Sequence, residues 1–171
     1  AKEIADQLTA KGLSVVLDDR QEYTPGWKFN QWELKGVPVR IEIGPRDLKQ
    51  QQVTLARRDT GQKTFVKEAD AVEAVEKLLV EIQHNLYAKA RVNLEQQTST
   101  VATYDEFKAV IAGKGGFVKA AWCGSADCEA KIKEETSATV RVIPFEKEEP
   151  NTGCIYCGQT AKEVAYFAKS Y

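Results

Sequence analysis

The chain has 171 residues, enough for one large domain or two small ones. Its hydrophobic content of 43% and charged content of 29% are those of an ordinary globular protein and exclude a low-complexity chain. The net charge of −1 excludes an overall basic protein, and no apolar run is long enough to predict a transmembrane helix or a signal peptide.

The first part of the chain is predicted to alternate between helix and strand. Apolar residues spaced three and four apart over residues 4–8 predict a helix that ends at Gly12. The apolar run 13–17 then predicts a short buried strand. A threonine–proline pair follows and fits an N-cap and first helical turn, which predicts a second helix over residues 24–34.

The next segment is predicted to form a strand, a short helix and a hairpin. Apolar and polar residues alternate over 37–43, so the sequence predicts a strand with Arg40 and Glu42 on its polar side. A glycine–proline pair ends this strand and opens a helix over 46–52. The two hairpin strands are predicted at 53–58 and 62–66.

A long helix is predicted over residues 68–95, because apolar side chains recur there every three or four positions. The members of this apolar stripe are Val72, Val75, Leu79, Ile82, Leu86 and Ala90. The polar run 96–100 is the first plausible seam between domains. We therefore expect two domains, 1–85 and 86–171, which the long helix joins.

The second predicted domain contains several short elements. Thr103 and Glu106 form a capping box, which predicts a helix that ends at Gly113. Strand, helix, strand and final strand are then predicted, in this order, at 117–122, 125–135, 138–143 and 163–169. The predicted fold class is an α/β domain, with a mixed sheet flanked by helices, followed by a small α+β domain.

The stretch 23–48 has an unusual mixture of side chains. Two tryptophans and a phenylalanine lie beside lysines and glutamates, between proline–glycine breaks. Such a mixture suits RNA: aromatic faces stack on bases, charged groups pair with base edges, and cations neutralise phosphates. Residues 28–67 contain nine Lys or Arg and four Asp or Glu, a surplus of five positive charges. The alternatives are a solvated face with scattered cations and, for Trp27 and Trp32, packing in a core.

Four cysteines give a second signal. Cys123 and Cys128 form one close pair, and after a gap of 25 residues Cys154 and Cys157 form a second. Two close pairs separated by a folded segment can bring four thiolates to one tetrahedral ion. We expect a structural zinc site, because four thiolates leave no open position for catalysis. The alternatives are an iron site of the rubredoxin kind, two disulfides, and four unrelated buried thiols.

The local context of the cysteines favours thiolates. Cys128 falls in the first turn of a predicted helix that Ser125 caps, so the helix dipole is expected to lower its thiol pKa. Gly158 follows the last cysteine and permits a tight turn whose backbone N–H groups point at the sulfurs. Other catalytic chemistry finds no support, because His84 is the only histidine and no GxxxxGK phosphate loop exists.

These features together resemble one family. The blocks GWKFNQWELKGVPVR (26–40), GPRDL (44–48) and RRDTG (57–61), with the four cysteines and a final Ser-Tyr, resemble the C-terminal part of archaeal/eukaryote-like prolyl-tRNA synthetases. The resemblance implies an anticodon-binding domain, here without its opening strand, then a zinc domain. It also implies a tail ending at Tyr171 that reaches back to the catalytic domain. Because that domain and every methionine are missing, we expect a fragment that is inactive alone.

The resemblance also implies the sites and partners. Proline codons begin with CC, so the second and third anticodon bases are both guanine, which offers acceptors to Arg or Lys and N–H donors to a carboxylate. The residues expected to read the guanines are Phe29, Glu33, Arg40 and Lys63. Those expected to contact phosphates weakly are Arg46, Arg57 and Arg58. The implied zinc ligands are Cys123, Cys128, Cys154 and Cys157.

The predicted function is thus recognition of proline tRNA by part of a class II proline–tRNA ligase. The resemblance implies that the full-length parent is a cytoplasmic homodimer that uses ATP and Mg and has no membrane contact. Its expected partners are proline tRNA and its own catalytic domain. The alternative is a stand-alone zinc-stapled module that binds RNA or protein without ligase activity, and an upstream catalytic domain in the parent gene would separate the two.

Overall fold

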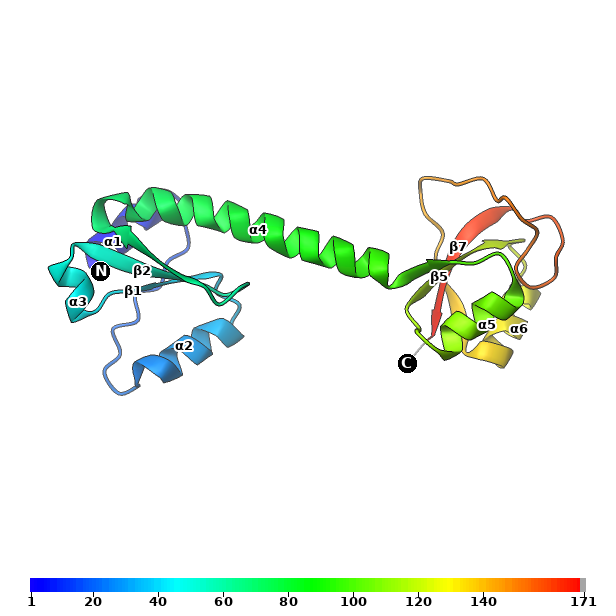
Figure 1. Ribbon diagram of the computed structural model, residues 1–171, viewed down its shortest axis with the longest axis horizontal. Coiled ribbons are helices and arrows are strands. Elements are labelled where there is room, and N and C mark those ends of the chain that lie inside the picture. Colours follow the sequence, from blue (N-terminus) through cyan, green and yellow to red (C-terminus); the bar gives the residue numbers. More distant parts are fainter. Residues whose placement is uncertain (170–171) are drawn as a thin grey trace. The chain divides into compact units, whose positions relative to one another are not determined.

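The computed structural model describes residues 1–169 (Figure 1), so the predicted tail residue Tyr171 lies outside the described part. The chain divides into two compact units, Ala1–Lys89 and Ala90–Tyr171, which we name unit 1 and unit 2. No helix among the described residues has the length and apolar character needed to cross a membrane. The predicted fold class, two small domains that combine helices and sheets, is confirmed.

Unit 1 is built on a three-stranded antiparallel sheet. Strands β1 (Val39–Glu42), β2 (Gln52–Arg57) and β3 (Lys63–Lys67) are hydrogen-bonded in the order β1-β2-β3. Helices α1 (Lys2–Ala10) and α4 (Ala71–Gln96), the second preceded by a 3-10 turn, cover its inner face. The residues that form this core are Ile4, Leu8, Val53, Leu55, Ala71 and Val75.

The opposite, outer face of this sheet carries two short helices. These are α2 (Pro25–Leu34) and α3 (Pro45–Lys49), and Figure 1 shows α2 and α4 on opposite sides of the sheet. The α2 helix begins as predicted, because the Thr24 side chain accepts a hydrogen bond from the Trp27 backbone N–H and proline occupies the first turn. The α2 helix therefore presents its side chains to the polar side of β1.

Two expectations for unit 1 are wrong in detail, and one feature of α4 is a new finding. The run 13–17 is not a strand, because no described strand pairs with it and Val16 is 64% exposed. The helix predicted at 46–52 ends at Lys49, since Gln51 takes a left-handed conformation and β2 begins at the next residue. The apolar stripe of α4 is buried only as far as Ile82.

The early end of this buried stripe has a geometric cause. A helix of 26 residues is about 39 Å long, whereas the longest strand of the unit, with six residues, spans about 20 Å. The helix therefore extends beyond the sheet that it covers. Leu86 and Ala90, which follow the same periodicity, are exposed.

Unit 2 contains a mixed four-stranded sheet with the order β4-β5-β7-β6. Its strands are β4 (Thr98–Thr100), β5 (Phe117–Trp122), β6 (Ala138–Val142) and β7 (Glu163–Lys169). Strand β4 pairs parallel to β5, and the other pairs are antiparallel. The polar run predicted as a seam therefore contributes a strand to this sheet.

Two helices of unit 2 close its core. They are α5 (Tyr104–Ala112), with the predicted capping box of Thr103 and Glu106, and α6 (Ala126–Thr136), which Ser125 caps. Phe107 of α5 and Phe167 of β7 are fully buried and meet edge to face, with ring centroids 5.3 Å apart. This core continues directly to Cys128 and Cys154.

Candidate nucleic-acid interface and metal centre

The four residues predicted to read guanine lie together on the outer face of unit 1. The Arg40 guanidinium carbon is 4.0 Å from the Phe29 ring centroid, and the Lys63 ammonium is 5.8 Å from it. Arg40 also donates a hydrogen bond to the Glu33 carboxylate at 2.7 Å. Helix α2 and strands β1 and β3 thus bring one ring, two cations and one carboxylate into contact.

Glu42 is the member of this site that the sequence interpretation missed. One oxygen of its carboxylate accepts a hydrogen bond from Arg40 Nε at 3.0 Å, and the other accepts one from Lys63 Nζ at 2.8 Å. The signal was present, because strand alternation places Glu42 beside Arg40 on the polar side of β1. The set that results, named here the outer-face cluster, is Phe29, Glu33, Arg40, Glu42 and Lys63.

The strand register explains how Arg40 and Lys63 reach one another. Arg40 pairs with Ala56 of the middle strand, and Ala56 pairs with Lys63. Paired residues share a face of the sheet, and the small alanine leaves the space between the two long side chains open. Arg40 and Glu42 are about four-fifths buried, whereas Glu33 is nearly half exposed. The outer-face cluster therefore has a fixed base and a solvent-facing rim.

The three arginines predicted to contact phosphates have different surroundings. Arg46 of α3 and Arg58 after β2 are exposed. Arg57 instead donates two hydrogen bonds of 2.8 Å to Asp59, which hold the pKa of that buried carboxyl well below its usual range. Asp59 also accepts a hydrogen bond from Asn85 of α4, so Arg57 fastens the hairpin turn to that helix.

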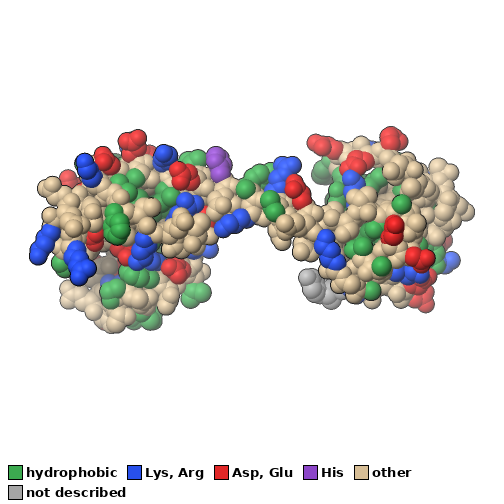
Figure 2. Space-filling model, in the orientation of Figure 1, with side chains coloured by type: hydrophobic (Ala, Val, Ile, Leu, Met, Phe, Trp, Pro, Cys, Tyr) green, Lys and Arg blue, Asp and Glu red, His purple; other side chains and the backbone are tan. Residues whose placement is uncertain are grey.

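Cations and acids alternate on the face of unit 1 that Figure 2 shows. A shallow depression beside the outer-face cluster is lined by Glu33, Arg40, Arg57 and Arg58, among others. Three arginines line this depression, and β3 carries two lysines.

Neither tryptophan of α2 packs in a buried core, so the core interpretation is wrong. Trp27 is 43% exposed and stacks on Tyr23 with ring centroids 3.9 Å apart. Trp32 is half-buried, and its indole donates a hydrogen bond to Asp18 at 2.8 Å. Two hydrogen bonds from Arg20 hold the pKa of Asp18 well below its usual range. These groups form a surface network that fixes the segment before α2.

The four cysteines of unit 2 converge on one point. Their sulfur atoms all lie within 4.8 Å of one another, with Cys123 3.6 Å from Cys128 and 4.0 Å from Cys157. All four are free thiols, so the disulfide alternative is wrong. Sulfurs of a tetrahedral metal site, with metal–sulfur bonds of about 2.3 Å, are about 3.8 Å apart. The cluster therefore has the dimensions of a four-thiolate metal site.

Tight backbone turns position the second pair of cysteines, Cys154 and Cys157. The Cys154 N–H donates to the Gln159 carbonyl at 2.7 Å, and the Gly158 N–H donates to the Cys154 carbonyl at 2.9 Å. A Cβ atom at position 153 would lie 2.5 Å from the Gly158 carbonyl oxygen, so only glycine fits there. The first pair comes from the end of β5 and the first turn of α6.

The thiols have very different proton affinities. Burial raises the pKa of Cys128 to about 12, with a further contribution from Cys123. The expected lowering by the helix dipole is therefore wrong for Cys128. Burial also acts on Cys154, but backbone N–H groups of Cys157, Tyr156 and Cys123 outweigh it and lower the pKa to about 7. The predicted knuckle geometry, with N–H groups aimed at sulfur, thus operates at Cys154.

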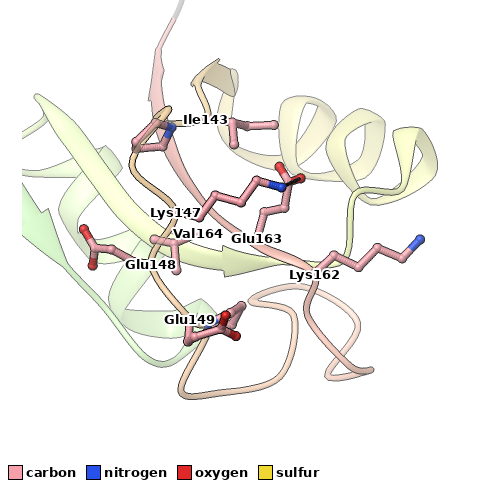
Figure 3. Close-up of a pocket in the computed structure, with 9 residues that line it drawn as sticks. Ile143, Lys147, Glu148, Glu149, Lys162, Glu163 and Val164 are labelled. Atoms are coloured by element: carbon pink, nitrogen blue, oxygen red, sulfur yellow. Dashed lines mark ion pairs between the residues drawn. The ribbon is translucent and has the colours of Figure 1, made fainter.

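A concavity of unit 2 lies between the loop 143–150 and the start of β7 (Figure 3). Lys147 lies 3.6 Å from Glu163, and Lys119 donates to Glu148 at 2.6 Å, so ion pairs hold the loop against the sheet. Lys162 points away from the Lys147–Glu163 pair. No cysteine and no predicted base-reading residue lines this concavity.

Two family models match the chain. The model "Anticodon binding domain" matches residues 1–78, and "Prolyl-tRNA synthetase, C-terminal" matches residues 104–171. The chain matches the C-terminal part of prolyl-tRNA synthetases. The first match contains the whole outer-face cluster, and the second contains all four cysteines. The archaeal/eukaryote-like type of synthetase stays a prediction.

Curated relatives agree with the family models. The chain is 52% identical over 171 residues to a proline–tRNA ligase of Alkaliphilus oremlandii (strain OhILAs), covering 100% of the chain and 35% of the relative. It is 48% identical over 164 residues to proline–tRNA ligase 2 of Clostridioides difficile (strain 630), covering 96% of the chain and 34% of the relative. The chain thus spans about a third of the length of the curated relatives that it matches.

Proposed function

We propose that this chain recognises proline tRNA as part of a cytoplasmic proline–tRNA ligase, and that the outer-face cluster reads the two guanines of the anticodon. The observation that carries the proposal is the convergence of Phe29, Glu33, Arg40 and Lys63 on one face of a domain that matches an anticodon-binding model. No catalytic residue is assigned to this chain. In the whole ligase, ATP and Mg belong to the catalytic domain, and the functional division is 1–85 and 86–171.

The chemistry of the outer-face cluster suits guanine. The ring of Phe29 offers a stacking surface, and the guanidinium of Arg40 can donate to N7 and O6 of a base. Glu33, which is the most exposed carboxylate of the cluster, can accept from N1–H and the exocyclic amine. In the free protein Arg40 and Glu33 hydrogen-bond to one another. A bound guanine would therefore replace that hydrogen bond with its own hydrogen bonds to both side chains. Glu42 keeps Arg40 and Lys63 in place during that exchange.

Phosphate contacts are assigned to Arg46 and Arg58, both exposed on unit 1. Arg57 contributes its charge, but its hydrogen bonds hold the hairpin turn. Because few free cations are involved, we expect the chain alone to bind tRNA weakly, with an affinity that falls as the salt concentration rises. The remaining affinity of the whole ligase would come from contacts to the acceptor arm.

For unit 2 we propose that Cys123, Cys128, Cys154 and Cys157 hold a structural zinc ion. The dimensions of the cluster support a tetrahedral ion, and the zinc would connect β5, α6 and the turn before β7. A domain this small needs such a staple. An iron site of the rubredoxin kind has the same ligands, and metal analysis of protein that was never chelated distinguishes the two.

The first test makes one substitution at each of two members of the outer-face cluster, and only the first of them keeps the shape of the side chain. Glu33→Gln removes the charged acceptor, and Arg40→Lys removes the planar fork. Discrimination is measured between the natural anticodon and anticodons in which one of the two guanines is replaced. Each substitution is expected to reduce this discrimination by about 1–3 kcal/mol. Glu134→Gln on α6 is the matched control, and it should change nothing.

Stability separates recognition from structure in this test. Glu33 is nearly half exposed, and lysine at position 40 keeps a positive charge beside Glu42, so the melting temperature should hardly move. A variant that melts markedly lower with unchanged selectivity would show that its residue is structural. Equal affinity of the unmodified chain for unrelated tRNAs would leave only a generic phosphate binder.

The role of the tail is a separate proposal. We place Tyr171 against the catalytic domain of the whole ligase, as the family resemblance implies. Deleting this residue from a full-length ligase should lower proline activation more than tRNA binding. The alternative is a dispensable terminus, which is common for final residues. Unaltered kinetics of aminoacyl-adenylate formation would establish that alternative.

A further inference from the structure

Phe65 on β3 is the most exposed aromatic side chain of unit 1, at 69%. A single exposed phenylalanine is common on protein surfaces and needs no explanation. Its position is what distinguishes it. Phe65 pairs with Thr54, which pairs with Glu42, so all three share the outer face of the sheet. Phe65 thus lies in the same row of the sheet as Glu42 and one row away from Arg40 and Lys63.

The neighbours of Phe65 are cationic along the strand. Lys63 and Lys67 lie two positions before and after it, and strand alternation puts both on the same face. Lys63 also belongs to the outer-face cluster, so one side chain is shared between the two features. An aromatic face between two lysines is the combination that single-stranded nucleic acid binds. No acidic residue occurs within β3.

The hydrogen-bonding side chains nearest Phe65 across the sheet are already engaged. Thr54 donates to Asp47 at 3.4 Å, and the Gln52 amide donates to the same carboxylate at 3.2 Å. Backbone and side-chain hydrogen bonds, first the one from the Gly44 N–H, lower the pKa of Asp47, which therefore stays an acceptor for them. A base placed on Phe65 would find a stacking surface and positive charge but few groups that distinguish one base from another.

We propose that Phe65 stacks on the first base of the anticodon and holds it without selecting its identity. This inference rests on the proposed function, in which the outer-face cluster reads the second and third bases. All four codons that begin with CC specify proline, so the two guanines are constant and the first anticodon base varies. A site for that base must tolerate every base, and stacking on an aromatic ring does so. The shared Lys63 places this platform directly beside the guanine-reading groups.

The test uses the whole chain and proline tRNA transcripts with 2-aminopurine as the first anticodon base. Fluorescence of this base is expected to be quenched on binding, because it stacks. Phe65→Ala should abolish the quenching and weaken binding about 5- to 150-fold, the range for one base–aromatic stack. Phe65→Tyr should keep both. Four further transcripts carry A, C, G or U as the first anticodon base. Phe65→Ala should bind each of them more weakly than the unmodified chain does, by the same factor in all four cases.

Two controls separate stacking from other effects. Phe145→Ala removes a fully exposed phenylalanine of unit 2, and it should change neither quenching nor affinity. Discrimination between guanine and other bases at the second and third positions should stay intact in Phe65→Ala. That result would show that the loss arises at the first base alone.

The outcomes are distinguishable. Unchanged quenching in Phe65→Ala would overturn the inference whether or not affinity falls, because a weakened hairpin could lower affinity without unstacking the base. In that case intact guanine discrimination would leave the proposed function standing. Absence of guanine discrimination in the unmodified chain would instead overturn the proposed function and this inference together.

Discussion

The candidate sites of the two units differ in how they relate to the hydrophobic core. In unit 1 the outer-face cluster lies on the sheet surface, and its members hydrogen-bond to one another through charged groups. In unit 2 Cys128 and Cys154 are buried and belong to the same core as Phe107 and Phe167. The site of unit 1 can therefore change while the fold remains, whereas the site of unit 2 is part of what holds the fold.

The two kinds of site also differ in how much they contribute to the stability of the fold. Surface ion pairs contribute about 0–1 kcal/mol each, because water competes for both partners. A structural zinc site contributes about 10–16 kcal/mol of apparent binding free energy, which becomes folding free energy when no site exists in the unfolded chain. Substitutions at the two sites should consequently give opposite patterns: lost recognition with intact stability in unit 1, and lost structure in unit 2.

The largest expected effect follows from Cys154→Ser. Loss of this ligand should release the metal, and the amides of α5 and β7 should lose protection from hydrogen exchange while those of β2 keep it. Mass spectrometry of peptides from each unit, with metal analysis of the same samples, measures both. Less than half an equivalent of metal in protein that was never chelated would contradict the metal site, as would unchanged protection in unit 2.

The reciprocal change is Leu55→Ala in the core of unit 1, where Leu55 is almost completely buried. It should destabilise unit 1 by about 2–5 kcal/mol, the usual cost of a large-to-small core substitution. Metal content and protection of unit 2 should not change. If Leu55→Ala unfolded both units together, their stabilities would be coupled. The contrast between the two units would then be wrong.

A smaller effect is expected from Glu42→Gln, which removes the charge that Arg40 and Lys63 share. Guanine discrimination should fall by about 1 kcal/mol, and the effect should be non-additive with Arg40→Lys because the two side chains are in direct contact. Binding titrations of the two single variants and the double variant complete the cycle. Additive losses would mean that Glu42 does not position Arg40.

The smallest effect concerns a local feature of unit 2. Thr103→Ala removes the side chain that caps α5, and it should cost about 1 kcal/mol. Unit 1 and the metal content should be unaffected. A thermal unfolding curve with tRNA binding measured in parallel would check this, and a change in tRNA binding would contradict the separation of the two units.

Features set by neighbouring residues could be predicted from the sequence. The helices that begin at Pro25 and Tyr104 were predicted because their capping residues are adjacent to them, and a capping hydrogen bond is local. Phe29 and Glu33 are four residues apart, and this spacing puts them on one face of α2. The four cysteines were grouped by their paired spacing in the chain.

Features set by distant partners could not be predicted. Residues 13–17 have the composition of a strand, but a strand also needs a neighbour, and composition does not reveal whether one exists. Arg57 was interpreted as a phosphate contact because its link to α4, through Asp59 and Asn85, joins residues 28 positions apart in the sequence. Glu42 was overlooked because a single acid on a polar strand face is ordinarily solvated.

The order of the strands in unit 2 has a consequence for synthesis on the ribosome. Strand β7 is made after β4, β5 and β6, yet it lies between β5 and β6 in the sheet. Until residues 163–169 have been made, β6 has no partner and the sheet stays open. A chain that stops early would expose the apolar faces of β5 and β6, along with its thiols, to proteases. The ribosome must therefore translate the residues of β7 before unit 2 becomes resistant to degradation.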